Sequence, residues 1–241
     1  MAGHSKFANI KHKKERQDSK RSKIFTKVGR EIAVAVKQGG SDPDMNPRLR
    51  DAIAKAKANN MPNDNIERGI KKAAGELGAV NYEEVTYEGY GPNGVAVIVN
   101  ALTDNRNRTA ANVRSAFTKG GGNMGQTGSV DYLFKRIGYI AIEKSDSVDE
   151  DSLMDIVLEV GATDFISQEE GYEIITEPND FSKVMDSIKN IYTVLSAEII
   201  SQPMTTVALT EPDHIKGFNK MIDLLEDDDD VQDVFHNGEN F

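Results

Sequence analysis

The chain has 241 residues, enough for one large domain or two to three small ones, and its 38% hydrophobic and 28% charged composition is typical of globular proteins. It has no apolar stretch near the roughly 20 residues of a membrane helix, no apolar segment behind its basic start and no cysteine, so we expect a cytoplasmic protein without membrane partner, secretory signal or disulfides. The net charge of −10 divides into +9 over residues 1–80 and −19 over residues 81–241. This division indicates a basic contact module on an acidic body. The alternative is a chance imbalance of charge between solvated surfaces.

The first 80 residues are predicted to be an arm followed by three helices. Residues 5–23 carry only Phe7, Ala8 and Ile10 as apolar side chains, too few to bury a face, so we expect a mobile arm. Helical periodicity then predicts helices over residues 24–39, 47–59 and 63–75. Because each apolar face is narrow, these helices should pack on one another as a small bundle.

After residue 81 the apolar period changes from about four to two, which predicts strands. Two strands should surround a turn at 91–94, and a helix over 107–121 and a strand over 128–134 should follow. Strands at 138–142, 163–167, 172–176 and 195–201 alternate with helices at 149–160 and 180–191 in a complete β-α-β-β-α-β pattern. The segment before Gly138 has only part of the elements of a second α/β sandwich. The missing part is supplied by a strand at 204–210, a helix at 212–226 and a strand at 230–236.

The predicted fold is therefore an α+β multidomain protein, with an N-terminal three-helix bundle and two α/β-sandwich (ferredoxin-like) domains, one inserted in the other. The arm and bundle should occupy residues 1–80. The outer sandwich should be discontinuous, over residues 81–137 and 204–241, with residues 138–203 inserted into it. Three domains strictly in series are the alternative.

The basic arm and the start of the first helix are the most informative stretch for function. Their lysines and arginines provide point charges and planar forks for phosphates, with aromatic and histidine side chains interleaved, so we predict a nucleic-acid contact. A solvated basic tail is the alternative. The predicted contact residues are Lys6, Lys11, Lys13, Lys14, Arg16, Lys20, Arg21, Lys23, Lys27 and Arg30.

The second and third helices are joined through Asn59, Asn60, Met61 and Pro62. They have the spacing of a helix-turn-helix whose second member presents Arg68, Lys71 and Lys72 to nucleic acid, although an ordinary bundle hairpin has the same spacing.

A basic island formed by Arg106, Arg108, Arg114 and Lys119 stands out within the acidic body and is a possible second contact. The glycine-rich loop behind it follows a helix and precedes a strand, the reverse of the dinucleotide-binding context, so we predict a flexible connection rather than a nucleotide site.

Enzyme chemistry has little support in the sequence. The histidines form no metal-ligand pair, and no nucleophile elbow is present. The acidic run Glu226–Asp230, with Asp233, lacks the spacing of a calcium loop and should be solvated. We therefore predict no catalytic residues, no metal and no cofactor, and a metal-dependent enzyme at this run is a distant alternative.

Several long motifs resemble the YebC/PmpR family of transcriptional regulators. They are AGHSKFANIKHKKERQDSKRSKIFTKVGREI, NPRLRDAIAKAKANNMPNDNIERGIKKAAG, YEGYGPNGVAVIVNALTDNRNRTAANVRSAF and GGNMGQTGSVDYLF. The resemblance implies a cytoplasmic protein of three domains, a helical bundle and two α+β domains, without established catalytic residues. Phe7 departs from the family, because many members have tryptophan there.

The resemblance implies a DNA-binding regulator of transcription that acts through the arm and bundle, with acidic domains that orient it or recruit a protein partner. Some relatives look like ribosome-associated factors that relieve stalling at proline runs, and mitochondrial relatives activate translation. The same basic surface on ribosomal RNA is therefore the alternative, and charge alone does not decide between the two partners.

Overall fold

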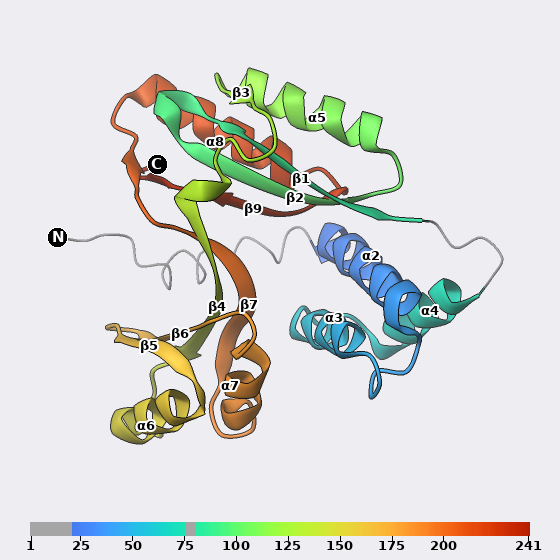
Figure 1. The fold of residues 1–241 in the computed structure, drawn as a ribbon, viewed down its shortest axis with the longest axis vertical. Coiled ribbons are helices and arrows are strands. Elements are labelled where there is room, and N and C mark those ends of the chain that lie inside the picture. The colour runs from blue at the N-terminus through green and yellow to red at the C-terminus, as the bar shows by residue number, and fades with distance from the viewer. Residues whose placement is uncertain (1–20, 76–80) are drawn as a thin grey trace. The chain divides into compact units, whose positions relative to one another are not determined.

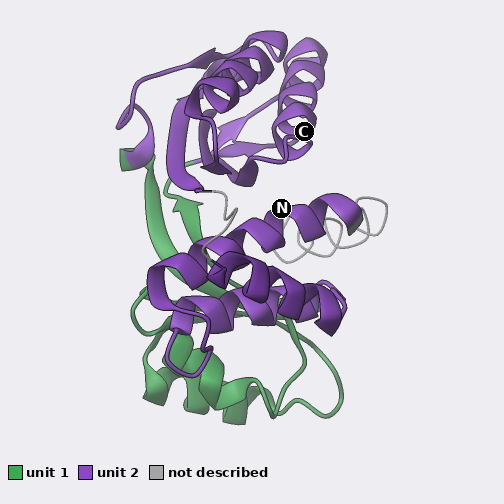
Figure 2. Ribbon diagram, turned by 90° about the vertical axis from the view of Figure 1, so that its right-hand side faces the viewer, with its two compact units in different colours: residues 1–15, 132–205 green, residues 16–131, 206–241 purple. Residues whose placement is uncertain are grey.

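The computed structural model describes residues 21–75 and 81–241. Contacts divide these residues into two compact units (Figure 2). One unit comprises residues 132–205, and the other comprises the described part of residues 21–131 together with residues 206–241. None of the helices in the described ranges is both long enough and apolar enough to cross a membrane.

The discontinuous unit begins with a bundle of three helices, α2 (Arg21–Gly39), α3 (Pro47–Ala58) and α4 (Asn63–Ala74) (Figure 1). Both α3 and α4 pack mainly on α2 rather than on each other. The core contains Val28 and Ile32 of α2, Leu49 of α3 and Ile66 of α4. The predicted bundle is confirmed, although α2 begins at Arg21, so that residues 21–23 belong to a helix and not to the arm.

Asn46 connects α2 to α3 as a buried cap. Its side-chain oxygen accepts from Leu49 N at 3.1 Å, in the first turn of α3. Its amide nitrogen donates to Ala35 O and to Gly40 O, both at 2.8 Å. One side chain therefore satisfies backbone groups at the end of one helix and at the start of the next.

The same unit continues into an antiparallel sheet in the order β3-β1-β2-β9. Helices α5 and α8 cover one face of this sheet, where Phe117 and Phe218 meet Val97 and Val99 in the core (Figure 1). The elements are β1 (Glu83–Tyr90), β2 (Ala96–Thr103), α5 (Arg106–Lys119), β3 (Asn123–Met124), α8 (Pro212–Glu226) and β9 (Val231–His236), with a separate parallel pair, β8 (Val207–Ala208) and β10 (Gly238–Glu239).

Two glycines allow α8 to lie close to the C-terminal end of α5, namely Gly217 of α8 and Gly120, the residue that follows α5. A Cβ atom on Gly217 of α8 would lie 2.6 Å from Gly120 O, and one on Gly120 would lie 2.5 Å from the Cβ atom of Met221. Both distances are shorter than a van der Waals contact. The two positions therefore require glycine because a side chain would not fit. Backbone conformation is not the reason, since neither residue has a positive φ.

The other unit is built from β4 (Phe134–Glu143), α6 (Glu150–Val160), β5 (Ala162–Ser167), β6 (Gly171–Thr176), α7 (Phe181–Ile188) and β7 (Val194–Pro203). Its strands form one antiparallel sheet in the order β5-β6-β4-β7. Leu153 of α6 and Val184 of α7 pack on Ile140 and Ile174 of the sheet. This is the ferredoxin-like arrangement, which confirms the predicted α+β fold class.

Two predicted strands are wrong, one because it is a turn and one because it is shorter than expected. Residues 131–133 form a single helical turn, so the strand predicted at 128–134 is replaced by β4, which begins at Phe134. Only Val207 and Ala208 of the strand predicted at 204–210 pair with another strand. The glycine-rich loop is likewise no free connection, because its residues 123 and 124 pair with β1 as the short strand β3.

A buried carboxylate explains the path of the chain after this loop. Glu88 of β1 is 3% exposed and accepts the backbone N–H groups of Gly128, Val130 and Asp131 at 2.7, 2.8 and 2.9 Å. Burial alone would raise the pKa of Glu88, but the three donors outweigh it and hold the pKa below its ordinary value. The backbone amides are thus drawn to Glu88 instead of to a strand partner.

Candidate nucleic-acid interface

One edge of α2 carries three of the cations that the sequence predicts as nucleic-acid contacts. Lys23, Lys27 and Arg30 are separated by four and three residues, the spacing that places side chains on one side of a helix. The apolar side of α2, with Val28 and Ile32, faces the bundle core. The packing of the bundle therefore leaves this cationic edge directed away from its own core.

The cationic edge contacts an acidic turn, which we define as Glu226–Asp230, between α8 and β9. Lys23 Nζ lies 3.0 Å from Asp227 Oδ1 and donates to Asp227 O at 3.2 Å. Lys27 Nζ donates to Glu226 O at 2.9 Å. Because carbonyl groups at a helix C-terminus are unpaired and partly negative, the end of α8 is a favourable place for these lysines.

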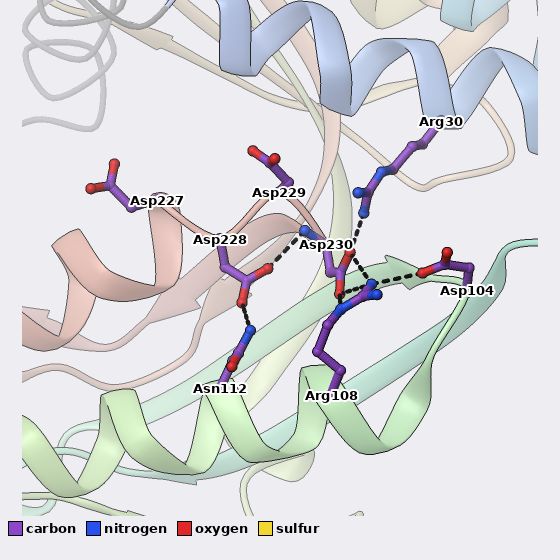
Figure 3. A pocket seen from close by; sticks show the side chains of 8 residues that line it. All are labelled: Arg30, Asp104, Arg108, Asn112, Asp227, Asp228, Asp229 and Asp230. Atoms are coloured by element: carbon purple, nitrogen blue, oxygen red, sulfur yellow. Dashed lines mark hydrogen bonds and ion pairs between the residues drawn. The ribbon is translucent and has the colours of Figure 1, made fainter.

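Asp230 is the centre of this contact and is only 2% exposed (Figure 3). Its carboxylate pairs with Arg30 of α2 and accepts from Arg108 Nη2 at 2.7 Å and from Thr109 Oγ1 at 2.6 Å, both on α5. Arg30 Nη1 also donates to Leu102 O at 3.0 Å. Thr103 Oγ1, at the end of β2, donates to the same carboxylate at 3.3 Å, so Asp230 joins the bundle, α5 and the end of β2 through one side chain.

The protonation of Asp230 follows from these partners. Burial would raise the pKa of this carboxyl group, but hydrogen bonds from Thr109, Arg108 and Arg30 outweigh burial, so the pKa lies below its ordinary value. The hydrogen bonds to Asp230 and Asp104 raise the pKa of Arg108 above its already high value. Both groups are therefore charged at neutral pH.

A polar pocket of about 380 Å³ lies beside Asp230. Figure 3 shows that Asn112 of α5 reaches Asp228, to which it donates at 2.8 Å. The lining residues are Arg30, Asp104, Arg108, Asn112 and Asp227–Asp230. Within residues 21–75 and 81–241, no three His, Cys, Asp or Glu side chains are grouped so that they could hold a metal ion.

Comparison with known proteins identifies the family. Residues 5–76 match the family model described as "TACO1/YebC protein N-terminal domain", and residues 82–238 match the model described as "TACO1/YebC second and third domain". The chain belongs to the TACO1/YebC family. The resemblance seen in the sequence motifs is therefore confirmed.

Relatives of the TACO1/YebC family match almost the whole chain. A protein of Acetivibrio thermocellus is 61% identical over 238 residues, covering 98% of each chain, and one of Hathewaya histolytica is 58% identical over 240 residues, covering 99% of this chain and 97% of its own. Both have names that begin "Probable transcriptional regulatory protein". The crystal structure of a conserved hypothetical protein from Aquifex aeolicus superposes with a TM-score of 0.81 at 47% identity, over 92% of this chain and 91% of that one.

Helix α4 presents a second group of predicted contacts in this TACO1/YebC member. Arg68, Lys71 and Lys72 are exposed on the second half of the helix. Arg68 donates to Asn65 Oδ1 at 2.8 Å. Among the residues that the structure describes, no carboxylate forms an ion pair with any of the three. These cations are thus accessible, in contrast to the cationic edge of α2.

The basic island predicted on α5 of this TACO1/YebC protein does not form one continuous accessible surface. Arg108 is bound to Asp230 and to Asp104, and Arg106 Nη1 lies 3.8 Å from Glu83 Oε2. Arg114 and Lys119 are exposed on later turns of α5. The structure therefore separates a paired first turn of α5 from two accessible cations further along it.

The predicted contacts of the arm, namely Lys6, Lys11, Lys13, Lys14, Arg16 and Lys20, lie outside the described residues, as does the side chain of Arg21. Within the described residues, the acidic run Glu226–Asp230 differs from its prediction. The prediction that this run is solvated is wrong for Asp230, which is buried. Its partners Arg30 and Arg108 are 200 and 122 residues distant in sequence, so no local pattern could have identified it.

Proposed function

We propose that this chain is a cytoplasmic, non-enzymatic regulator of gene expression that binds nucleic acid through the cationic surface of its N-terminal arm and bundle. The names of its relatives support transcription as the regulated process, and a regulator of transcription would take DNA as the nucleic acid. The observation that carries the proposal is the accessible group Arg68, Lys71 and Lys72. Their spacing of three and four residues gathers three positive charges on one side of α4, a suitable contact for phosphates.

The experiment that tests the proposal reverses two of these charges. The double variant Lys71→Glu, Lys72→Glu should bind a 20-base-pair duplex DNA with about 10- to 100-fold lower affinity at 100 mM salt, and should lower the slope of log affinity against log salt by about two. Fluorescence anisotropy over 50–300 mM salt measures both quantities.

A matched control separates a local contact from net charge. Lys216 and Lys220 are exposed one turn apart on α8, so Lys216→Glu, Lys220→Glu makes the same change in net charge on the acidic body. We expect this control to change the affinity less than threefold. Equal losses in the two double variants would contradict a binding surface on α4.

The charge order along α4 favours a second candidate, in which the nucleic acid is ribosomal RNA and the regulated process is translation. A recognition helix contacts base edges with its N-terminal residues. In α4 the first half exposes Asp64 and Glu67, and the cations follow from Arg68 onward. Acidic side chains at the N-terminal end of α4 are repelled by the phosphates that line a DNA groove, so this order disfavours insertion of α4 into the groove. It favours contacts between the cations further along α4 and the phosphates of a structured RNA.

Sedimentation of a cell lysate distinguishes the two candidates. Migration of the protein with ribosomal particles, lost after RNase treatment, would support the ribosomal candidate. Recovery of the protein on specific chromosomal fragments, with none in the ribosomal fractions, would support transcription.

A further inference from the structure

Polar contacts connect the bundle to the sheet domain of the same unit, by which we mean the sheet β3-β1-β2-β9 with helices α5 and α8. The core of the bundle and the core around β2, α5 and α8 share no residue within the described ranges. Between them lie the contacts of Lys23, Lys27 and Arg30 with the acidic turn, together with an ion pair between Arg48 of α3 and Glu84 of β1. Charged contacts are weakened by salt and are open to competition from other anions.

The acidic turn binds α2 with the same kinds of group that a nucleic-acid backbone offers. It presents carboxylates and carbonyl oxygens to two lysines and one arginine, and an arginine donates hydrogen bonds to a phosphate as readily as to a carboxylate. The side chain of Arg30 is only 15% exposed and that of Asp230 only 3%. Nucleic acid therefore reaches Arg30 only after α2 has left the acidic turn.

We propose that the acidic turn is an intramolecular competitor of nucleic acid, which occupies the cationic edge of α2 and is displaced when phosphates bind there. The inference rests on the proposed function and adds a regulatory contact to it. The closed arrangement keeps Lys23, Lys27 and Arg30 in contact with the acidic turn, whereas Arg68, Lys71 and Lys72 of α4 are exposed and available for a first encounter. Displacement then adds three cations to the binding surface.

Two substitutions in the acidic turn release the cationic edge, and a third is their control. Asp230→Asn removes the ion pair with Arg30, and Asp227→Asn removes the pair with Lys23. Asp229 is exposed in the same turn, so Asp229→Asn makes the same change in charge without removing either pair. If the closed form is populated about nine-tenths of the time, its loss raises the apparent affinity about tenfold.

The binding measurement uses the full chain with two probes, a 20-base-pair duplex DNA and an RNA hairpin with the same number of phosphates. We expect Asp230→Asn to bind about tenfold more tightly than the parent chain and Asp227→Asn about two- to fivefold, whereas Asp229→Asn should differ by less than twofold. Comparison of the two probes shows which kind of nucleic acid the released edge of α2 binds more tightly. Should Asp230→Asn fail to fold in a melting control, the comparison of Asp227→Asn with Asp229→Asn decides.

A distance measurement reports the displacement directly. Because the chain has no cysteine, Ala54→Cys on α3 and Thr118→Cys on α5 place one spin label on the bundle and one on the sheet domain, both at exposed positions. We expect a longer distance population when either probe is added, and the same population in Asp230→Asn alone.

The possible failures are distinct. If the parent chain binds a probe, the three variants bind it as tightly as the parent does, and the spin-label distance is constant, the competitor is refuted and the proposed function stands. If neither probe binds the parent chain or any variant, the proposed function and the competitor are both refuted.

Discussion

Replacing Glu88 with glutamine tests whether one buried carboxylate fixes the segment that leads from β3 to β4. The change keeps the shape of the side chain but replaces one acceptor oxygen by an amide NH₂ group, which cannot accept a hydrogen bond. Gly128 donates to one oxygen, and Val130 and Asp131 donate to the other. Whichever way the amide lies, at least one of these backbone N–H groups loses its acceptor and the rest meet a neutral oxygen.

The magnitude follows from these three contacts. A hydrogen bond to a charged group contributes about 1.5–3 kcal/mol, and a buried donor without a partner costs about 1–3 kcal/mol. We therefore expect Glu88→Gln to lower the free energy of unfolding by about 2–4 kcal/mol. For a domain of this size, that loss corresponds to a Tm lower by about 5–15 °C.

Urea and thermal unfolding followed by circular dichroism measure the effect, with Glu83→Gln as control. Glu83 lies on the same strand, its side chain is 62% exposed, and its loss should cost about 0.5 kcal/mol or less. The pKa of Glu88 is lowered in the folded chain, so its charge stabilises the fold above the unfolded pKa of about 4.3. That stabilisation is lost as the pH falls through the folded pKa.

The stability difference between Glu88→Gln and the parent chain should therefore be full at pH 7 and should shrink toward pH 3. A variant as stable as Glu83→Gln at pH 7 would refute the reasoning. So would a stability difference that is the same at pH 7 and pH 3.

Two further predictions concern packing and capping. Gly217→Ala should lower the free energy of unfolding by about 1–2 kcal/mol, because the clash with Gly120 O outweighs the helix propensity of alanine, whereas Gly29→Ala, with open space around it, should raise it by about 0.5–1 kcal/mol; equal melting temperatures for the two would contradict the close crossing. Asn46→Ala should cost the bundle about 2–4 kcal/mol in urea unfolding, because three hydrogen bonds are lost, two of them buried, and a cost below about 0.5 kcal/mol would show that the cap is dispensable.

Much of the fold could be predicted because its signals are local. The apolar spacing in residues 24–36 and the proline at position 47 are enough to place α2 and α3, and the β-α-β-β-α-β order at 138–203 follows from changes of period. The errors arise where a distant residue decides. The strand expected at 128–134 is a turn because Glu88 binds its amides from 40 to 43 residues away.

The sequence predicts which cations belong to the candidate site but not which of them form ion pairs in the folded chain. The sequence identifies the lysines and arginines of α2, α4 and α5, because charge is a property of each residue. It does not show that Arg30 and Arg108 share Asp230, since that meeting depends on the folded positions of three distant segments. Exposure therefore separates cations that the sequence treats alike, namely those of α4 from those of α2.

The pairing of β2 with β9 also sets the order in which the chain is completed during synthesis. The residues of β2 precede their partners in β9 by roughly 130 positions, a wait of roughly 7–25 s at about 5–20 residues per second. Residues 132–205 pair their strands entirely among themselves, so they can finish folding within that interval. The interior unit can thus fold before the outer sheet is complete. When β9 leaves the ribosome it closes that sheet and brings Asp230, which directly precedes it, to its two arginines.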